Sequence, residues 1–316
     1  MCMDRVNNQI LLELMKNSRI TNKQLSKKIK VSREVIAYRI NKLINEKIIL
    51  NFTTEINYKK LGFIAGSIYL NIKEDKQDEF IEFLFNSNYI SWAVELSGIW
   101  NFGFSILGKT VEEIDARFNE MYLRFKDEIL NHRFTIHKQT KYFYEKYFNE
   151  RIDLKIKKHK KEEIIKIDNI DKLILKELVK NSRIELTKLS LITKISPQAV
   201  SKRIKRLEDN NYISKYYIFI DISKLNIYQY EIFITNNNKT INERLFNHLE
   251  FRLDISYIAE YIGDPYLEFG LIVKSPYDVR NKLQEIISLF KNITIIQIDL
   301  FQKEYIAISP PACVFE

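Results

Sequence analysis

The chain repeats itself at an offset of 164 residues. The segment LMKNSRI at 14–20 returns as LVKNSRI at 178–184, and at the same offset Ser32 returns as Ser196 and Leu43 as Leu207. A period this long indicates a duplicated unit of domain size, because the repeats of solenoid proteins are much shorter. The 316 residues are enough for two copies of a two-domain unit. Any fold assigned to one half must therefore also suit the other half.

Each copy begins with a pattern of three short helices. In the first copy, apolar residues recur at helical spacing over 4–16, Thr21 starts a capping-box pattern, and Ser32 precedes a third amphipathic stretch. The segment at 48–56 then alternates like a strand. Three helices followed by a strand predict a winged helix-turn-helix domain in which the strand forms the wing.

The third helices, SREVIAYRINKLINE from 32 and SPQAVSKRIKRLEDN from 196, carry the candidate binding residues. Ser196 is placed to cap its helix, and Pro197 occupies a first helical position whose N–H needs no partner. One face is apolar and would face a core, whereas the other is polar and basic, which suits the major groove of DNA. An ordinary solvated helix has the same pattern. The candidate DNA-binding residues are Arg33, Glu34, Tyr38, Asn41, Lys42, Gln198, Ser201, Lys202, Lys205 and Arg206.

Two further arginines, Arg39 and Arg203, occupy equivalent positions near the backs of these helices. Their positions are compatible with either of two roles, a structural ion pair or a contact with a DNA phosphate. For the exposed candidates, Arg33 to guanine and Asn41 or Gln198 to adenine are the bidentate pairings that geometry allows.

The second part of each copy changes to a period of two. Strand-like and helical segments follow in the order β-α-β-β-α-β, which predicts a ferredoxin-like domain with both helices on one face of an antiparallel sheet. The other face carries aromatic residues and needs a cover. We expect an α+β protein with winged helix-turn-helix domains at 1–62 and 164–226, ferredoxin-like domains at 63–150 and 227–316, and a basic linker at 151–163.

Charge alternates with these predicted domains. The net charge is +9: residues 1–62 hold 13 cations and 5 anions and 164–226 hold 13 and 7, whereas 63–150 hold 10 and 14 and 227–316 hold 8 and 12. Two basic modules between two acidic ones indicate a protein that binds a polyanion. Two cysteines near opposite ends of the chain rule out a disulfide framework. Because no apolar signal core or run of about 18 apolar residues occurs, we expect a cytoplasmic protein without membrane insertion.

The helical part of each copy resembles the Lrp/AsnC (feast/famine) family of transcription regulators. The first copy carries DRVNNQILLELMKNSRIT, LSKKIKVS and VIAYRINKL, and the second carries IDNIDKLILKELVKNSRIELTKLS and ISPQAVSKRIKRLEDNNYIS. The resemblance implies a DNA-binding domain and a ferredoxin-like domain that dimerises and often senses amino acids. Because such chains usually hold one unit, this one resembles a covalently joined dimer. The implied partners are double-stranded DNA and further copies of the chain.

The resemblance also implies a ligand loop that usually reads Gly, any residue, aromatic, Asp after the second strand of the ferredoxin-like domain. The first copy offers Gly98, Trp100 and Asn101, in which asparagine replaces the carboxylate; the second offers Gly263 and Asp264, in which the acid is displaced. A carboxylate is a natural partner for the ammonium group of an amino acid. An amino-acid effector site and a structural turn are therefore the two alternatives.

No spacing typical of catalysis or metal binding occurs. The four histidines lack metal-ligand or dyad spacing, and no Gly-rich phosphate loop or CxxC is present. We therefore expect no catalytic residue, metal or cofactor, and a sequence-specific regulator that reads two non-identical half-sites. The alternative is a fused enzyme similar to the paired sirohaem decarboxylases of haem synthesis, which share this two-domain architecture. A scaffold that binds protein through its helical domains is a third reading.

Overall fold

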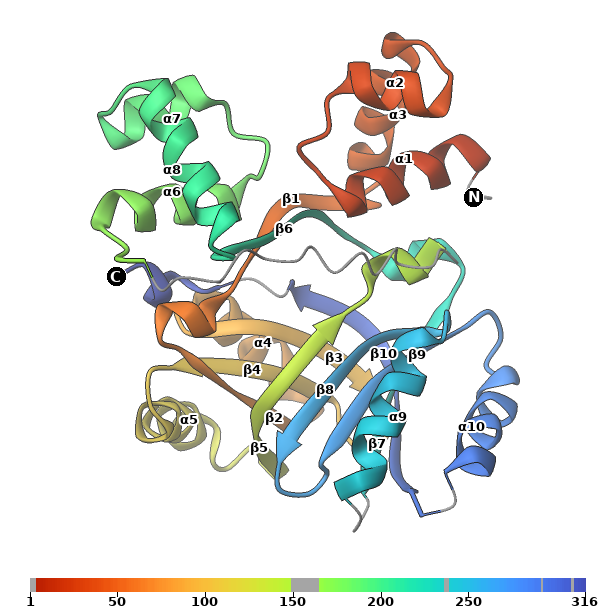
Figure 1. The fold of residues 1–316 in the computed structure, drawn as a ribbon. Coiled ribbons are helices and arrows are strands. Elements are labelled where there is room, and N and C mark those ends of the chain that lie inside the picture. Colours follow the sequence, from red (N-terminus) through yellow and green to blue (C-terminus); the bar gives the residue numbers. More distant parts are fainter. Residues whose placement is uncertain (1–3, 149–164, 236–238, 291, 308–309) are drawn as a thin grey trace. The chain divides into compact units, whose positions relative to one another are not determined.

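The computed structural model describes residues 4–148, 165–235, 239–290, 292–307 and 310–316. It divides into two compact units, each of which combines segments from both copies (Figure 1). Unit 1 contains both helical domains, and unit 2 contains both sheet domains. The bounds are Met1–Phe63, Leu154–Asp221 and Ala307–Glu316 for unit 1, and Ile64–Asp153 and Ile222–Ile306 for unit 2. The linker predicted at 151–163 lies outside the described residues.

In unit 1 each copy forms three helices and one strand. They are α1 (Arg5–Lys16), α2 (Asn22–Ile29), α3 (Arg33–Asn45) and β1 (Ile49–Ile56) in the first copy, and α6 (Asn169–Lys180), α7 (Leu186–Thr193), α8 (Pro197–Asp209) and β6 (Ile213–Ile220) in the second. Thr21 forms the predicted capping box with Gln24, and the hydroxyls of Ser32 and Ser196 accept hydrogen bonds from the third residue of each following helix. These oxygens satisfy N–H groups that have no partner in the first turn.

Strands β1 and β6 pair with each other, antiparallel, between the two groups of helices (Figure 1). The strand expected to form a wing within its own copy is instead shared between the copies. The hydroxyls of Thr53 and Thr54 on β1 donate hydrogen bonds to the carbonyl oxygens of Val179 (2.8 Å) and Leu178 (2.7 Å) on α6. Ile56, also on β1, is buried in the core of the second helical domain. The two helical domains therefore share a core.

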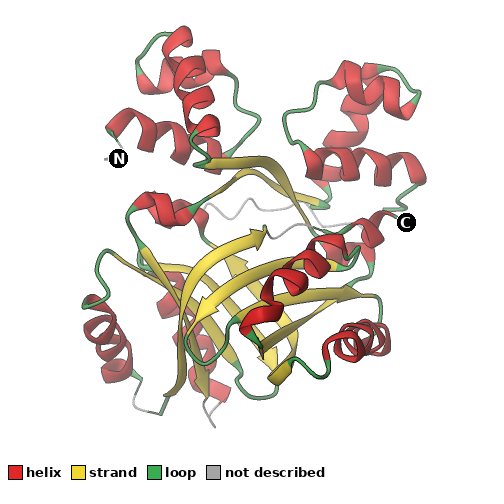
Figure 2. Cartoon of the chain, turned by 180° about the vertical axis from the view of Figure 1, so that it is seen from behind, coloured by secondary structure: helices red, strands yellow, loops and turns green. Residues whose placement is uncertain are grey.

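In unit 2 each copy follows the predicted order β-α-β-β-α-β. The elements are β2 (Ile64–Ile72), α4 (Gln77–Asn86), β3 (Ile90–Ser97), β4 (Phe102–Gly108), α5 (Val111–Phe125) and β5 (Ile129–Tyr142), then β7 (Tyr228–Thr235), α9 (Lys239–Phe251), β8 (Ile255–Ile262), β9 (Leu267–Val273), α10 (Asp278–Leu289) and β10 (Thr294–Ile306). This confirms the predicted α+β class with two ferredoxin-like domains. Figure 2 shows the helices of this unit outside its strands.

The strands of unit 2 close into one barrel in the order β10-β3-β4-β2-β5-β8-β9-β7. The copies meet at two antiparallel seams, β5 with β8 and β10 with β3, where Thr140 lies opposite Ala259 and Phe301 lies opposite Leu96. The sheet face that needed a cover is therefore covered by the other copy. The two ferredoxin-like domains therefore pair within one chain.

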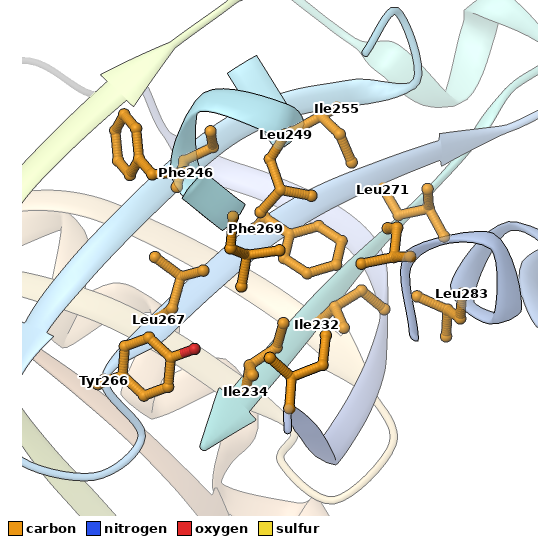
Figure 3. Close-up of a cluster of buried hydrophobic side chains, with 14 of the residues drawn as sticks. Ile232, Ile234, Phe246, Leu249, Ile255, Tyr266, Leu267, Phe269, Leu271 and Leu283 are labelled. Carbon is orange, nitrogen blue, oxygen red and sulfur yellow. The ribbon is translucent and has the colours of Figure 1, made fainter. Parts of the chain in front are cut away.

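Helices α9 and α10 cover the outer face of the second sheet with an apolar layer. Figure 3 shows Leu249 of α9 and Leu283 of α10 beside Ile232 and Phe269 of the strands, and all four are at most 4% exposed. Burial of one such side chain contributes about 1.5–3 kcal/mol relative to its exposed state. No helix within the described ranges is both long and apolar enough to cross a membrane.

The inside of the barrel, by contrast, combines an apolar cluster that includes Trp100 and Phe233 with buried carboxylic acids. Glu268 on β9 accepts a hydrogen bond from the Tyr69 hydroxyl of the first copy at 2.7 Å, and two further tyrosines also donate to it. Glu231 on β7 is fully buried, and neither of its carboxylate oxygens has a hydrogen-bond partner among the described residues. Burial raises the pKa of Glu231 well above its usual range, and the charges of Glu268 and Asp299 raise it further. The folded barrel therefore favours the protonated acid.

We predict that Glu231→Gln weakens the pH dependence of stability. Because the pKa of Glu231 is raised in the folded state, the wild type binds an extra proton when folded, and its free energy of unfolding falls as pH rises above the usual glutamate range. Glutamine does not ionise, so the variant loses this slope. Denaturant unfolding should show nearly equal stabilities at about pH 5 and a variant more stable by about 1–3 kcal/mol at about pH 9.

The exposed Glu120→Gln, on α5, serves as the matched control and should leave the slope unchanged. Glu268 and Asp299, whose charges raise the pKa of Glu231, and Tyr257, which acts to lower it, remain in both variants. Parallel pH profiles for wild type and Glu231→Gln would show that Glu231 is ionised in the folded barrel.

Candidate nucleic-acid interface

The repeated NSRI turns hold the two helical domains together. Ser18 and Ser182 are fully buried, and their hydroxyl oxygens lie 2.6 Å apart. Arg19 donates a hydrogen bond to the carbonyl oxygen of Ser182 at 2.7 Å, and Arg183 donates to that of Ser18 at 2.6 Å. Each guanidinium also lies over an aromatic ring of the shared β1–β6 sheet, 5.3 Å and 4.4 Å from the ring centres. Each contact made by one copy is thus returned by the other, as in a symmetric dimer.

Helices α3 and α8 bury equivalent faces. At the 164-residue offset, Ile36, Ile40 and Leu43 of α3 correspond to Val200, Ile204 and Leu207 of α8, and all six are buried. This repeated apolar face fixes which side of each helix points outward. The outward sides carry different residues in the two copies, because the repeat constrains only the buried positions.

The outward sides carry the candidate DNA-binding residues. Arg33, Glu34, Tyr38 and Asn41 of α3 are exposed and Lys42 is half-buried, and Gln198, Ser201, Lys202, Lys205 and Arg206 of α8 are all exposed. Tyr38 is 67% exposed, which is unusual for an aromatic side chain in the middle of a helix. Lys202 and Lys205 form no ion pair with any described residue, so their charges are available to an anion.

Glu34 is the single carboxylate among these candidates. Hydrogen bonds from its own backbone N–H and from the Ser32 side chain lower the pKa of Glu34. It therefore stays ionised next to Arg33 in the first turn of α3. An anion there opposes contact with a phosphate but can accept a hydrogen bond from the amino group of cytosine.

Arg39 and Arg203 both point towards the first helix of their own copy. Arg39 contacts Asp4 at 2.5 Å and the side-chain oxygen of Asn7 at 2.9 Å. Arg203 contacts Asp168 at 2.7 Å. The hydrogen bond from Arg39 is the main reason why the pKa of Asp4 is lowered. Of the two roles left open by the sequence, the structural ion pair is the one that this geometry supports.

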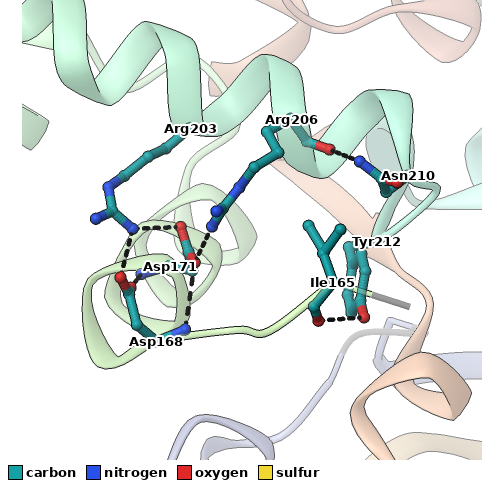
Figure 4. Close-up of polar contacts among 7 residues, drawn as sticks. All are labelled: Ile165, Asp168, Asp171, Arg203, Arg206, Asn210 and Tyr212. Carbon is teal, nitrogen blue, oxygen red and sulfur yellow. Dashed lines mark hydrogen bonds and ion pairs between the residues drawn. The ribbon is translucent and has the colours of Figure 1, made fainter. Parts of the chain in front are cut away.

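A buried carboxylate gives α8 a contact that α3 lacks. Asp171 in the first turn of α6 is completely buried, and it contacts Arg203 at 2.9 Å and also Arg206 (Figure 4). Arg206 was a candidate for DNA binding, yet its guanidinium is held by Asp171. Its side chain remains 42% exposed, so the ion pair reduces its availability without burying it.

Among the described residues, the first copy has no equivalent of the contact between Asp171 and Arg206. At the 164-residue offset Asn7 takes the place of Asp171 and Lys42 takes the place of Arg206. Lys42 approaches Glu46, one turn further on, at 3.8 Å. Sequence reasoning compared the exposed residues of the third helices alone and missed this difference. The sequence did contain a signal for it, because Asn7 of the first copy is replaced by the acidic Asp171 in the second.

The candidate ligand loop of the first copy is occupied by residues of the barrel. The side chain of Asn101 accepts a hydrogen bond from the Ile72 N–H at 3.1 Å and donates to the Ile72 carbonyl at 2.9 Å. Asp299 of the second copy accepts from the N–H of Ile99 at 2.5 Å. A Cβ atom on Gly98 would lie 2.0 Å from an Asp299 oxygen, so only glycine fits there. Trp100 is 6% exposed.

The corresponding loop of the second copy is open. Gly263 has a φ of +107°, and no atom lies within 4 Å of the position that a Cβ would take. Asp264 is exposed beside it and precedes a cis peptide bond to Pro265. Gly98, Gly263 and Asp264 are exposed, whereas Trp100 is buried and the side chain of Asn101 is hydrogen-bonded to Ile72. Because Asp299 fills the space beside Gly98, the loop of the second copy is the one left open.

Comparison with known proteins gives matches to both helical domains. A family model for winged helix-turn-helix DNA-binding domains matches residues 3–49 and 167–214. The transcriptional regulator LrpA of Bacillus subtilis is 29% identical over 131 residues, which cover 41% of this chain and 90% of that protein. An uncharacterised HTH-type regulator of Pyrococcus furiosus is 40% identical over 73 residues, 23% of this chain and 48% of its own length.

Among solved structures, the sirohaem decarboxylase NirDL has a similar fold. The TM-score is 0.63 with 10% sequence identity, and the match covers 95% of this chain and 92% of NirDL. At that identity the match concerns the fold alone. The match supports a fold with two helical and two ferredoxin-like domains in one chain.

We predict that Asp171→Ala costs more stability than the equivalent change in the first copy, Asn7→Ala. The aspartate variant leaves two arginines without their buried partner and should lower the free energy of unfolding by about 2–3 kcal/mol. The asparagine variant removes one hydrogen bond and should cost about 1 kcal/mol. Denaturant unfolding of both variants measures the difference. Equal losses would mean that the ion pairs of Asp171 add nothing to stability.

Proposed function

We propose that this chain, which is an Lrp/AsnC-type protein in a tandem duplicated form, is a transcription regulator that reads two adjacent, non-identical half-sites on double-stranded DNA. One observation carries the proposal: α3 and α8 bury equivalent residues in a shared unit but carry different residues outward. A homodimer of such domains reads the same half-site twice, because its two recognition helices are identical. A fused pair has no such restriction. A protein of this function acts in the cytoplasm.

The outward residues of α3 suit base recognition. Arg33 and Asn41 are exposed and have the donor and acceptor groups for bidentate pairing with guanine and adenine. Tyr38 lies between them in sequence and is well exposed. Lys42, which approaches Glu46, is placed for a phosphate at the end of the helix.

The outward residues of α8 suit contact with the DNA backbone. Lys202 and Lys205 are exposed cations without a described ion-pair partner, and Arg206 is partly neutralised by Asp171. Gln198 and Ser201, nearer the start of the helix, remain for base contacts. We infer that the second domain mainly positions the protein and that the first domain contributes more of the sequence discrimination.

The proposed backbone role of α8 predicts a change in salt dependence. Replacing Lys202 and Lys205 with alanine should weaken binding about equally for all DNA sequences, and the slope of log K against log salt should fall by about 2. Binding isotherms at several salt concentrations, on a bound genomic fragment and on an unrelated duplex, give both quantities. Lys126→Ala, an exposed change in unit 2, is the control. An unchanged slope would remove both lysines from the interface.

The proposed base role of α3 predicts a loss of discrimination confined to one half-site. Arg33→Ala should reduce the preference for the correct base at one position by about 1–3 kcal/mol and leave the other half-site unaffected. Competition binding against a library randomised in each half-site measures this. If both half-sites lose discrimination equally, or if the two selected half-sites are identical, the proposal of non-identical reading is wrong.

The proposed regulator would also self-associate and could respond to an amino-acid effector. We infer that further assembly uses surfaces other than β3–β10 and β5–β8, because those edges are paired within the chain. An amino-acid effector, if bound in the family's loop, would use the exposed Gly263 and Asp264, because no atom lies within 4 Å of the Cβ position of Gly263. Mass measurement in solution, with and without amino acids, addresses both points.

A second function is suggested by the fold of NirDL, which is a sirohaem decarboxylase. A tetrapyrrole with several carboxylates needs cationic partners. The barrel interior holds three buried acids, Glu231, Glu268 and Asp299, and Arg133 donates a hydrogen bond to Gln297 beside them. Whether protonated or ionised, these acids supply no positive charge for the carboxylates of such a substrate. Titration with a tetrapyrrole, followed by absorbance, separates the two functions, since a regulator of the proposed kind gives salt-sensitive DNA binding and no tetrapyrrole spectrum.

A further inference from the structure

A cavity of about 510 Å³ lies in unit 2, where β7 begins and β9 ends. This volume is in the range of small-molecule sites. The cavity is at the end of β8 opposite to Gly263, because Asp254 lines it and precedes that strand whereas Gly263 follows it. It is therefore separate from the candidate ligand loop. Its apolar wall consists of Ile227, Phe251, Leu253, Ile272 and Val273.

Part of this cavity is built by the first copy. Lys146 and Tyr147 belong to a short 3-10 helix (Tyr144–Phe148) that follows β5 and lines the cavity of the second copy. Lys146 is 4% exposed, donates a hydrogen bond to the carbonyl oxygen of Glu250 at 2.9 Å, and lies 3.8 Å from the centre of the Phe143 ring. Burial lowers the pKa of Lys146 to about 8, although nearby carboxylates act to raise it. An anion beside this ammonium would offset the cost of its burial.

The charged residues of the lining include more cations than anions. Besides Lys146, the lining includes Arg252, Lys274 and Lys282 and one carboxylate, Asp254. Asp254 accepts two hydrogen bonds from Arg252, at 2.8 Å and 2.6 Å, and lies 3.4 Å from Lys282. Lys274 is exposed and forms no ion pair with a described residue. Glu285, which lies outside the lining, also contacts Arg252 at 2.9 Å and Lys282 at 3.8 Å. Lys274 is therefore the lining cation whose charge is most available to an anion.

The first copy repeats this arrangement only in part. Strands β3 and β8 begin at Ile90 and Ile255, so Ser87 and Tyr89 stand where the second copy has Arg252 and Asp254. At the same register Lys109 and Arg117 stand where the second copy has Lys274 and Lys282. The pair Arg252 and Asp254 is therefore the part of the lining that is particular to the second copy.

We propose that this cavity binds a small organic anion, with its carboxylate or phosphate facing Lys146, Lys274 and Lys282 and its apolar body on the wall formed by Phe251 and Ile272. The volume of the cavity matches a small molecule and not a macromolecular anion. An inorganic anion would leave the apolar wall unused. The site goes beyond the proposed DNA binding and does not depend on it.

Calorimetric titration of the full chain, without DNA, tests the site with matched probes. 4-Phenylbutyrate should bind, whereas 4-phenylbutylamine, which has the same body and the opposite charge, should bind at least about tenfold more weakly. The double variant Lys274→Gln/Lys282→Gln should raise the Kd for 4-phenylbutyrate at least about tenfold. Asp254 keeps its two hydrogen bonds from Arg252 in this variant, and the contact of Lys282 with Glu285 is partly exposed and contributes little to stability, so the variant should fold. Lys126→Gln is the matched control.

A second variant separates the apolar wall from the cations. Phe251 is 71% exposed, so Phe251→Ala should leave the fold intact, weaken 4-phenylbutyrate and leave any weak binding of inorganic phosphate unchanged. No binding of 4-phenylbutyrate up to millimolar concentration, equal binding of the amine, or wild-type affinity in the lysine double variant would each overturn the proposal. These outcomes are independent of DNA binding, which is measured separately by the salt dependence described above.

Discussion

Unit 1 depends on the exchange of a strand between the two copies. Strand β1 lies on α6 and pairs with β6, and Ser18 meets Ser182 through buried hydroxyls 2.6 Å apart. Buried hydroxyls and backbone groups must find partners, and here each copy supplies the partners of the other. The two recognition helices consequently belong to one compact unit. This coupling, more than any property of a single helix, is what makes a two-site reader physically reasonable.

Covalent fusion also releases the copies from having to remain identical. In a homodimer, any substitution appears twice, whereas here Asn7 and Asp171 can differ at one equivalent position and give α8 an ion pair that α3 lacks. The same holds in unit 2, where Asp299 occupies the turn at Gly98 while the turn at Gly263 is open. Divergence thus reaches buried polar positions as well as loops, whereas the apolar buried faces of α3 and α8 stay alike because packing tolerates fewer changes there.

Unit 2 closes its barrel around groups that are costly to bury. Glu231 has no described hydrogen-bond partner, and Glu268 is satisfied by tyrosine hydroxyls from both copies, Tyr69 among them. A buried charged carboxylate would cost several kcal/mol, so the protonated form is favoured and the raised pKa follows. The apolar layer between the second sheet and α9 and α10 supplies stability on the outer face.

The sequence by itself determined the local structure: the duplication, the caps at Thr21, Ser32 and Ser196, the order of strands and helices, and the buried faces of α3 and α8. These follow from periodicity and from residues within one turn of each other. Tertiary structure alone decided that β1 pairs with β6, that β5 meets β8, and that Arg206 is held by Asp171. Such partners lie far apart in sequence. The alternating pattern of a strand is equally compatible with a partner strand from its own copy. Which partner it takes depends on the core that the whole chain can close.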